Sequence, residues 1–443
     1  MSEAQNTSLT QGNITRAILR FALPFMGSSI FQLLYNLVDM IVVGQFSDSA
    51  GISAVNNAGQ IMQLVTFMVT GIGTGATVLI GRHVGAGRDK EVGRTICNVI
   101  YLFAAVAAVM TALVLLLGNA AVAAMQVPQA AVTPSRAYLR ICGIGTVFIV
   151  GYNVVSCILR GLGDSKRPMI FIAISCVANI FGDLLLVGGF HMGAAGAAAA
   201  TVAAQALSFL IALITLRRSG LNYPLDWTLE AKRGLQVLRL GLPVGLQDVL
   251  VTVSFLIITV VVNMLGLAQS AAVGVVERIV STVMMIPSAF LAALAAFTAQ
   301  NMGAQKPERA VRAMRISILV CLAISAVAVA VIQLFPALLA RAFTSDAEVI
   351  AHCVLYMRTY SIDCLTVCFV FCMNGFFSGC GHTRFSMANG LASTFLVRVP
   401  LVIWFATWPN VTMLQIGMAA PAASLAQIAM QLIYYRTGRW KTE

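Results

Sequence analysis

Long apolar segments alternate with short polar ones along the whole chain. Many windows hold about 20 or more apolar residues, enough to cross a hydrocarbon core of about 30 Å as a helix. Lipid offers the backbone no hydrogen-bond partner, so the segments are helical, and they are too long for barrel strands. The pattern predicts an all-α membrane protein with twelve spans, near residues 21–43, 53–80, 95–118, 137–159, 168–190, 193–216, 240–265, 269–299, 314–338, 350–378, 386–408 and 411–435.

The same pattern is present twice. Residues Tyr138–Arg140 recur as Tyr356–Arg358, and Gly161–Gly163 recur as Gly379–Gly381, both at an offset of 218 residues. Six spans separate the copies, and because six is even the two halves run in the same direction. The repeat predicts two parallel six-helix lobes, a plan common among secondary transporters.

The connection between the halves is polar and basic, and it contains Pro224 and Asp226. Such a segment is a good lobe boundary. We therefore expect an N-terminal lobe at residues 1–217, a cytoplasmic linker at 218–238 and a C-terminal lobe at 239–443. Gly71 and Gly75 form a small-residue face that allows close helix contact.

Composition and charge agree with a membrane location. The chain is 59% hydrophobic and 10% charged, whereas soluble domains are about 25% charged. The net charge is +12, and 22 of the 28 basic residues fall on segments that face one side of the membrane. This asymmetry predicts an inner-membrane protein with both termini in the cytoplasm, and it explains the basicity without nucleic acid.

Ionisable residues inside spans are costly and mark functional sites. Each lies in a segment that is otherwise apolar. There are seven: Asp39, Asp183, Asp248, Glu277, Arg278, Asp363 and Arg398.

In the N-terminal lobe, acids join polar residues on single helix faces. Four residues of the first span share one face because they are spaced i, i+3, i+4 and i+7. Asn179 and Asp183 share a face of the fifth span, and Thr201 lies on the sixth. The four of the first span are Gln32, Tyr35, Asn36 and Asp39.

Asp39 and Asp183 are expected at similar depths in the membrane. At a rise of 1.5 Å per residue, Asp39 lies roughly 27 Å and Asp183 roughly 22 Å from the inner start of its span, so both are in the outer half. Two carboxylates without a base can take up protons or hold a cation. The alternative is that Asp39 reaches the outer interface and Asp183 is structural. The polar stripe favours an ion-coupling site in a hydrated cavity.

The C-terminal lobe differs because it holds bases as well as acids. Asp248, Glu277 and Asp363 accompany Arg278 and Arg398. A structural or gating ion-pair network and a second ion site are both consistent with this composition. The repeat places Val397 and Leu401 opposite Asn179 and Asp183, so the N-terminal constellation is not duplicated.

Other chemistry lacks a pattern in the sequence. The ten cysteines form no CxxC pair, and the stripe Cys364, Cys368 and Cys372 suits packing better than a soft metal. There is no GxxxxGK[ST] loop and no HExxH motif, so we expect neither an enzyme nor a cofactor or resident metal. A channel fits the composition, but repeated lobes with acids near the midplane favour a carrier.

The whole chain resembles the multidrug and toxic compound extrusion (MATE) family, in the branch that resembles the DNA-damage-inducible F protein. The resemblance rests on Leu23-Pro24, the string YNLVDMIVVGQ, and Asn179, Asp183 and Thr201. It implies that Pro24 bends the first helix and that Asp39 and Asp183 are coupling carboxylates. It further implies that Asn179 and Thr201 are their partners, and that Gln32, Tyr35 and Asn36 line the substrate cavity.

The resemblance also implies a V-shaped pair of lobes around a central cavity, and a monomer that exports organic cations by alternating access in exchange for protons or sodium ions. The family's sodium-coupled branch uses acids at positions that align with Val251 and Val367 here. Asp248 and Asp363 lie about one turn away. The alternative is a flippase for a lipid-linked precursor, although such proteins usually have extra spans and a basic cavity.

Overall fold

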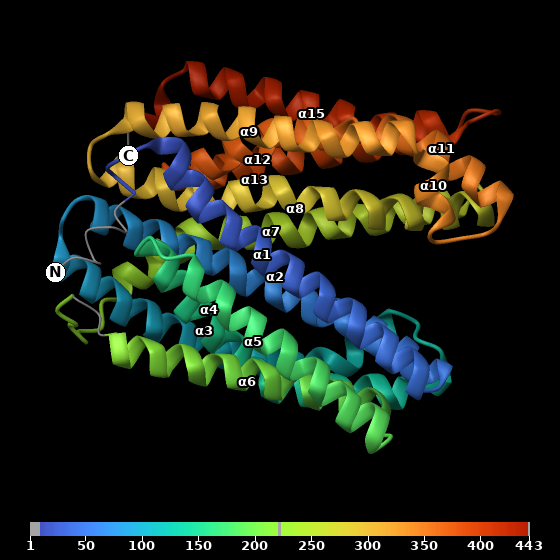
Figure 1. Ribbon diagram of the computed structural model, residues 1–443, viewed down its shortest axis with the longest axis horizontal. Helices are drawn as coiled ribbons and strands as arrows, with labels where there is room; N and C mark the ends of the chain where they lie inside the picture. The colour runs from blue at the N-terminus through green and yellow to red at the C-terminus, as the bar shows by residue number, and fades with distance from the viewer. Residues whose placement is uncertain (1–8, 220–222, 442–443) are drawn as a thin grey trace. The chain divides into compact units, whose positions relative to one another are not determined.

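The fold is all-helical. The structure, a computed structural model, describes residues 9–219 and 223–441, and these contain no β-strand (Figure 1). Within these residues, eleven helices are each long and apolar enough to cross a membrane, and a bent pair of helices makes twelve if it counts as one span. The predicted fold class is therefore confirmed.

In the first half, α4 is the central helix. It contacts α2, α3 and α6, and α5 contacts α6. Their apolar faces form a core that includes Phe103, Ile158 and Phe171. The helices are α1 (Ile14–Phe46), α2 (Ser49–Gly85), α3 (Asp89–Ala124), α4 (Gln129–Gly161), α5 (Lys166–Asp183) and α6 (Gly193–Ser219).

In the second half, α8 contacts α9, α11 and α12, and α15 contacts α11 and α12. Val276, Met357 and Ile416 belong to its core. The helices are α7 (Ala231–Asn263), α8 (Leu267–Gly303), α9 (Pro307–Leu334), α10 (Pro336–Arg341), α11 (Ala347–Tyr360), α12 (Asp363–Gly379), α13 (Thr383–Ser393), α14 (Val399–Ala406) and α15 (Met413–Arg436).

One expected span is broken and two contain π-helical turns. Residues 350–378 form α11 and α12, which are bent by 43° where Asp363 begins α12. A carboxylate is favoured at this position by the helix dipole. The π-helical segments are η2 (Leu184–Gly189), directly after Asp183, and η3 (Thr394–Arg398). Such turns are often found at functional sites.

The compact units do not begin and end where the expected lobes do. One unit includes Leu23–Gly245, and the other joins Leu9–Ala22 to the chain from Leu246 onward. The expected linker, as far as it is described, and the first part of α7 thus belong to the first unit. The beginning of α1 belongs to the second.

Candidate functional site

The polar stripe of α1 runs from exposed to buried positions. Gln32 and Asn36 are exposed, Tyr35 is half-buried, and Asp39 is 9% exposed. Pro24 lies earlier in the same helix, which continues through it. A proline there removes one helical hydrogen bond and permits a bend.

A close contact between α5 and α6 positions the other half of the site. A Cβ atom on Gly182 would lie 2.9 Å from the Cβ of Ala200, so a larger residue at 182 would push the helices apart. The next residue on each helix is polar, namely Asp183 and Thr201. The Tyr35 hydroxyl donates a hydrogen bond of 2.9 Å to Thr201 Oγ1, which ties α1 to α6.

The two acids meet inside the first unit. The carboxyl groups of Asp39 and Asp183 lie within electrostatic reach, and close enough to hydrogen-bond each other when one is protonated. Asp39 Oδ1 and both carboxylate oxygens of Asp183 are buried, and no residue that the structure describes donates a hydrogen bond to them. Asn179 and Asp183 are fully buried, and the Asn179 amide also has no hydrogen bond from the described side chains.

Two further residues border the acids. Tyr138 and Cys142 of α4 are buried within electrostatic reach of Asp39, and Cys142 is also within reach of Tyr35. Their i, i+4 spacing puts both on one face of α4. In the sequence, Tyr138 is identified only as a marker of the repeat. The signal that could have placed it beside the acids is its i, i+4 spacing with Cys142.

A pair of buried carboxylates repel each other unless something neutralises them. No basic side chain in the described part of the chain forms an ion pair with Asp39 or Asp183. The pair is stable with a shared proton or with a bound cation, and neutralisation removes the repulsion. The two carboxylates can therefore bind a proton or another small cation and release it again.

The buried charges of the second unit are arranged differently. Asp363 accepts hydrogen bonds from Ser424 at 2.5 Å and from Thr366 at 2.9 Å. Arg398 lies over the Phe255 ring, 4.1 Å from its centroid, and its guanidinium is 3.5 Å from the Tyr360 hydroxyl.

Arg398 also acts on both neighbouring acids electrostatically, although neither is in an ion pair with it within 4 Å among the described residues. Glu277 Oε1 is buried and receives no hydrogen bond from residues 9–219 or 223–441. The positively charged guanidinium of Arg398 thus already lies near both acids of the second unit.

The remaining candidates are not part of these clusters. Asp248 is half-buried on α7, Arg278 is exposed, and neither forms an ion pair with another described residue. The thiol of Cys368 donates to Ser325 Oγ at 3.2 Å. In the described part of the chain, no three His, Cys, Asp or Glu residues are placed to hold a metal ion.

Comparison with known proteins gives one family. The model of the MatE family matches twice, at residues 24–185 and 243–404, so the two matches are offset by 219 residues at both ends. The offset agrees within one residue with the repeat seen in the sequence.

Relatives match almost end to end. A probable multidrug resistance protein, YpnP of Bacillus subtilis, is 25% identical and covers 98% of this chain and 97% of its own. The probable multidrug resistance protein NorM of Thermotoga maritima is 24% identical, and the match covers 97% of this chain and 93% of NorM. An outward-facing multidrug resistance MATE family transporter superimposes with a TM-score of 0.92 at 22% identity, over 100% of this chain and 99% of its own. That likeness shows the fold.

Proposed function

Because the chain belongs to the MATE family of membrane transporters, we propose that it is a secondary antiporter that exports amphipathic or cationic organic compounds in exchange for protons or sodium ions. Two of its relatives are named as probable multidrug resistance proteins. The chain would lie in the inner membrane with both termini in the cytoplasm, as its basic segments indicate.

The observation that carries the proposal is the opposed pair Asp39 and Asp183. The pair is buried, and among the residues that the structure describes it has no basic partner and keeps oxygen atoms without a hydrogen bond. Such a pair is costly in an apolar bundle unless it is loaded with a cation. Loading from the outside and unloading to the inside is the chemistry that an antiporter requires.

Neighbouring residues supply a means of coupling. The bond from Tyr35 to Thr201 joins the stripe of α1 to α6 next to the acids. Loading the pair removes repulsion between α1 and α5, so α1 can approach α5 and change the cavity that Gln32, Tyr35 and Asn36 would line. Pro24 gives α1 a place to bend. Asn179 would orient the loaded carboxyl, as the buried residue one turn before Asp183.

The charge of the site argues against the flippase alternative. An anionic headgroup is bound by basic residues, whereas the buried site of the first unit contains acids and no base in the residues described. An organic cation is compatible with such a site, because it is attracted by the unloaded pair and released when the pair is neutralised.

The test is ethidium efflux from proteoliposomes in which the proton gradient and the sodium gradient are imposed separately. We expect one of the two gradients to drive transport, and Asp39→Asn and Asp183→Asn each to abolish it. The matched control is Asp248→Asn, which neutralises a half-buried acid outside the site. Full transport by both site variants would refute the proposed mechanism.

A further inference from the structure

The connection before α7, residues 224–230, has no regular secondary structure, and its side chains follow a pattern. Apolar side chains alternate with polar ones, and an alternation of period two puts the two kinds on opposite sides of a chain. We call the three exposed apolar side chains the apolar row. They are Leu225, Trp227 and Leu229, which are exposed over 42, 52 and 70% of their surface. A row of large exposed apolar side chains indicates a contact surface.

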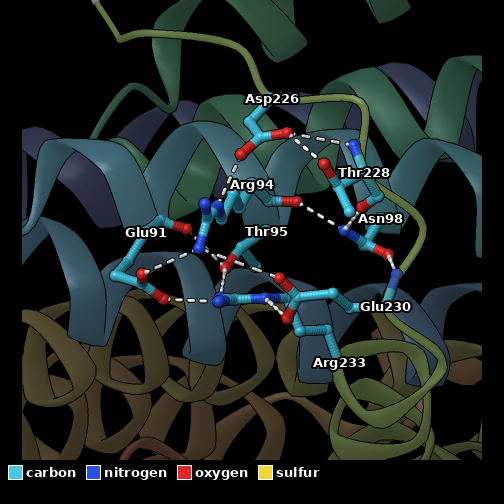
Figure 2. Close-up of polar contacts among 8 residues, drawn as sticks. All are labelled: Glu91, Arg94, Thr95, Asn98, Asp226, Thr228, Glu230 and Arg233. Atoms are coloured by element: carbon cyan, nitrogen blue, oxygen red, sulfur yellow. Dashed lines mark hydrogen bonds and ion pairs between the residues drawn. The ribbon is translucent and has the colours of Figure 1, made fainter.

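The charged side chains of the connection bind it to the first unit (Figure 2). Asp226 pairs with Arg94 of α3 at 2.6 Å. Glu230 pairs with Arg233 at 2.6 Å, and Arg233 in turn pairs with Glu91 of α3 at 2.5 Å. The charged side of the connection is therefore turned toward α3 and α7, and the apolar row is left on the outside.

The backbone of the connection is held as well. The Asn98 side chain of α3 donates to Thr228 O at 3.0 Å and accepts from the Glu230 backbone N–H at 2.7 Å (Figure 2). Residue 93 of α3 is glycine where the Pro224 carbonyl approaches, and a Cβ atom there would clash with that carbonyl. Because side chains and backbone are both bound, the apolar row has a definite place beside α3.

The beginning of α7, which follows the connection, is attached to α2. A Cβ atom on Gly71 would clash with the backbone of Gly245, and one on Gly75 would clash with Val237 O and the backbone of Gly241. The small-residue face that the sequence predicts is thus a close helix contact. This contact holds the end of the connection in the first unit.

Trp227 gives the level of the apolar row along α3. Its ring meets the Tyr101 ring edge-on, with centroids 5.9 Å apart, and its carbonyl accepts a hydrogen bond of 3.2 Å from the Tyr101 hydroxyl. Tyr101 lies about two turns, or roughly 10 Å, beyond Arg94. Arg94 is the last charged residue of α3, which continues to Ala124. The apolar row therefore lies where α3 enters its uncharged part.

The exposed face of α3 beyond Tyr101 is apolar. In a helix that spans a membrane such a face lies against acyl chains, and Trp and Tyr are enriched where the acyl chains meet the headgroups. The contact between Trp227 and Tyr101 is at this boundary. The exposed residues beyond it include Ala104, Ala105, Ala108 and Val109.

Basic residues lie at the beginnings of the two helices that hold the connection. Lys90 is one turn before Arg94 on α3, Lys232 is in the first turn of α7, and both are exposed. Basic side chains near a membrane surface are attracted by anionic headgroups. The order along α3 is thus basic, aromatic and apolar, which is the order that a bilayer favours from its headgroups to its acyl chains.

From this order we propose that the connection is a membrane-interface anchor, whose apolar row lies among the headgroups and first acyl carbons of the cytoplasmic leaflet. A segment with one apolar and one polar face binds in this zone, with the apolar face buried about 5–10 Å. The polar face is occupied by α3 and α7, so only the apolar face is free for lipid. The anchor depends on the membrane location of the chain, and it does not depend on what the chain transports.

The experiment measures the depth of the apolar row in a bilayer. Leu225→Cys and Leu229→Cys, each in the full chain, carry a nitroxide label in vesicles of phosphatidylethanolamine and phosphatidylglycerol. The ten native cysteines are buried, so the label reacts with the introduced thiol. Power saturation compares collisions with oxygen, which concentrates in lipid, and with a nickel chelate, which stays in water.

Two exposed positions of the first unit are the matched references. Arg88→Cys, between α2 and α3, reports water, and Val109→Cys, on the apolar face of α3, reports lipid. We expect the ratio of oxygen to nickel collisions at both leucine positions to be severalfold higher than at Arg88→Cys and lower than at Val109→Cys.

A ratio at the leucine positions equal to that of Arg88→Cys would show that the apolar row faces water and would overturn the proposal. Few collisions with either reagent would show that protein covers the row, and would overturn it as well. A lipid-like ratio at Val109→Cys shows in each case that the chain is inserted. Because the measurement needs no gradient and no ethidium, failed efflux would leave the anchor in place.

Discussion

The two units bury their acids in opposite ways. In the first, Asp39 and Asp183 lie close to each other, and the described part of the chain places no base between them and no hydrogen-bond partner at three of their oxygens. In the second, Asp363 receives two hydroxyl hydrogen bonds and lies within the field of Arg398. The halves match the same family model, but backbone and side chains both differ at these acids, because Asp363 begins α12 at a 43° bend whereas the matching helix α4 is continuous. A satisfied acid stabilises its surroundings, whereas an unsatisfied pair is free to bind and release a cation.

The contrast extends to the buried amides of the second unit. Gln431 donates to Asn374 Oδ1 at 2.9 Å, and Ser393 donates to Gln427 Oε1 at 3.1 Å. The repeat places Phe171, a core residue of the first unit, opposite Asn389 of this network. Hydrogen bonds between α12, α13 and α15 thus add to the apolar core of the second unit.

The largest difference in efflux rate should be between variants that neutralise an acid of the first unit and a variant that neutralises Asp363 of the second unit. Asp39→Asn or Asp183→Asn should lower gradient-driven efflux by at least about tenfold, which corresponds to ~1.4 kcal/mol. Asp363→Asn should keep most of the activity, because its carboxylate is already satisfied. Initial efflux rates at equal reconstituted protein measure this. If Asp363→Asn lowered the efflux rate as much as Asp39→Asn or Asp183→Asn, the proposed functional difference between the acids of the two units would be wrong.

Breaking the charge balance of the second unit should cost stability instead. Arg398→Met leaves Glu277 and Asp363 without their cation, and removing one partner of a buried charge cluster costs about 3 kcal/mol. Thermal unfolding of the purified protein should detect it, and added Glu277→Gln should restore part of the loss. Asp39→Asn, the matched change in the first unit, should not destabilise. A stable Arg398→Met protein would contradict this account.

A smaller effect should follow from cutting the link between α1 and α6. Tyr35→Phe and Thr201→Val each remove the same hydrogen bond, worth about 1 kcal/mol, so each should slow efflux by roughly fivefold. The double variant should be no worse than either single one, because one interaction is lost in all three. Additive losses would show that the two side chains act separately.

The smallest effect should be that of pH on the ion pair between Arg94 of α3 and Asp226, in the connection before α7. Hydrogen bonds from Thr228 and Arg94 hold the pKa of the Asp226 carboxyl at about 2, below its ordinary 3.8. A depressed pKa adds stability above the ordinary value, and this stability is lost as the pH falls through about 2. Tryptic cleavage next to this ion pair should therefore be constant from neutral to mildly acidic pH. Cleavage that rises over this range would show that the ion pair responds to pH.

Much of the fold followed from the sequence, because hydropathy fixes the number of spans and the repeat fixes their order. Within the site, helical spacing put Gln32 and Tyr35 on the face of Asp39, and Asn179 on that of Asp183. What spacing lacks is the contact between helices. It did not indicate that Tyr35 bonds Thr201, that Cys142 borders the acids, or that α11 and α12 bend at Asp363.

The contacts that hold Asp226 and Glu230 in the first unit were missed for the same reason. A polar, basic stretch looks like a flexible linker, and only the partners of Asp226 and Glu230 on α3 and α7 show that it is fixed. The sequence likewise does not show that the beginning of α1 belongs to the second unit and the beginning of α7 to the first, because this depends on tertiary packing.

The most direct test of a coupling site confined to the first unit is competition between ion and substrate. The dissociation constant of ethidium is measured for wild type, Asp183→Asn and Asp363→Asn at acidic and alkaline pH, with and without sodium. We predict that wild type and Asp363→Asn bind ethidium more weakly as the coupling ion is raised, and that Asp183→Asn loses this dependence. A dependence that persists in Asp183→Asn and disappears in Asp363→Asn would contradict the account.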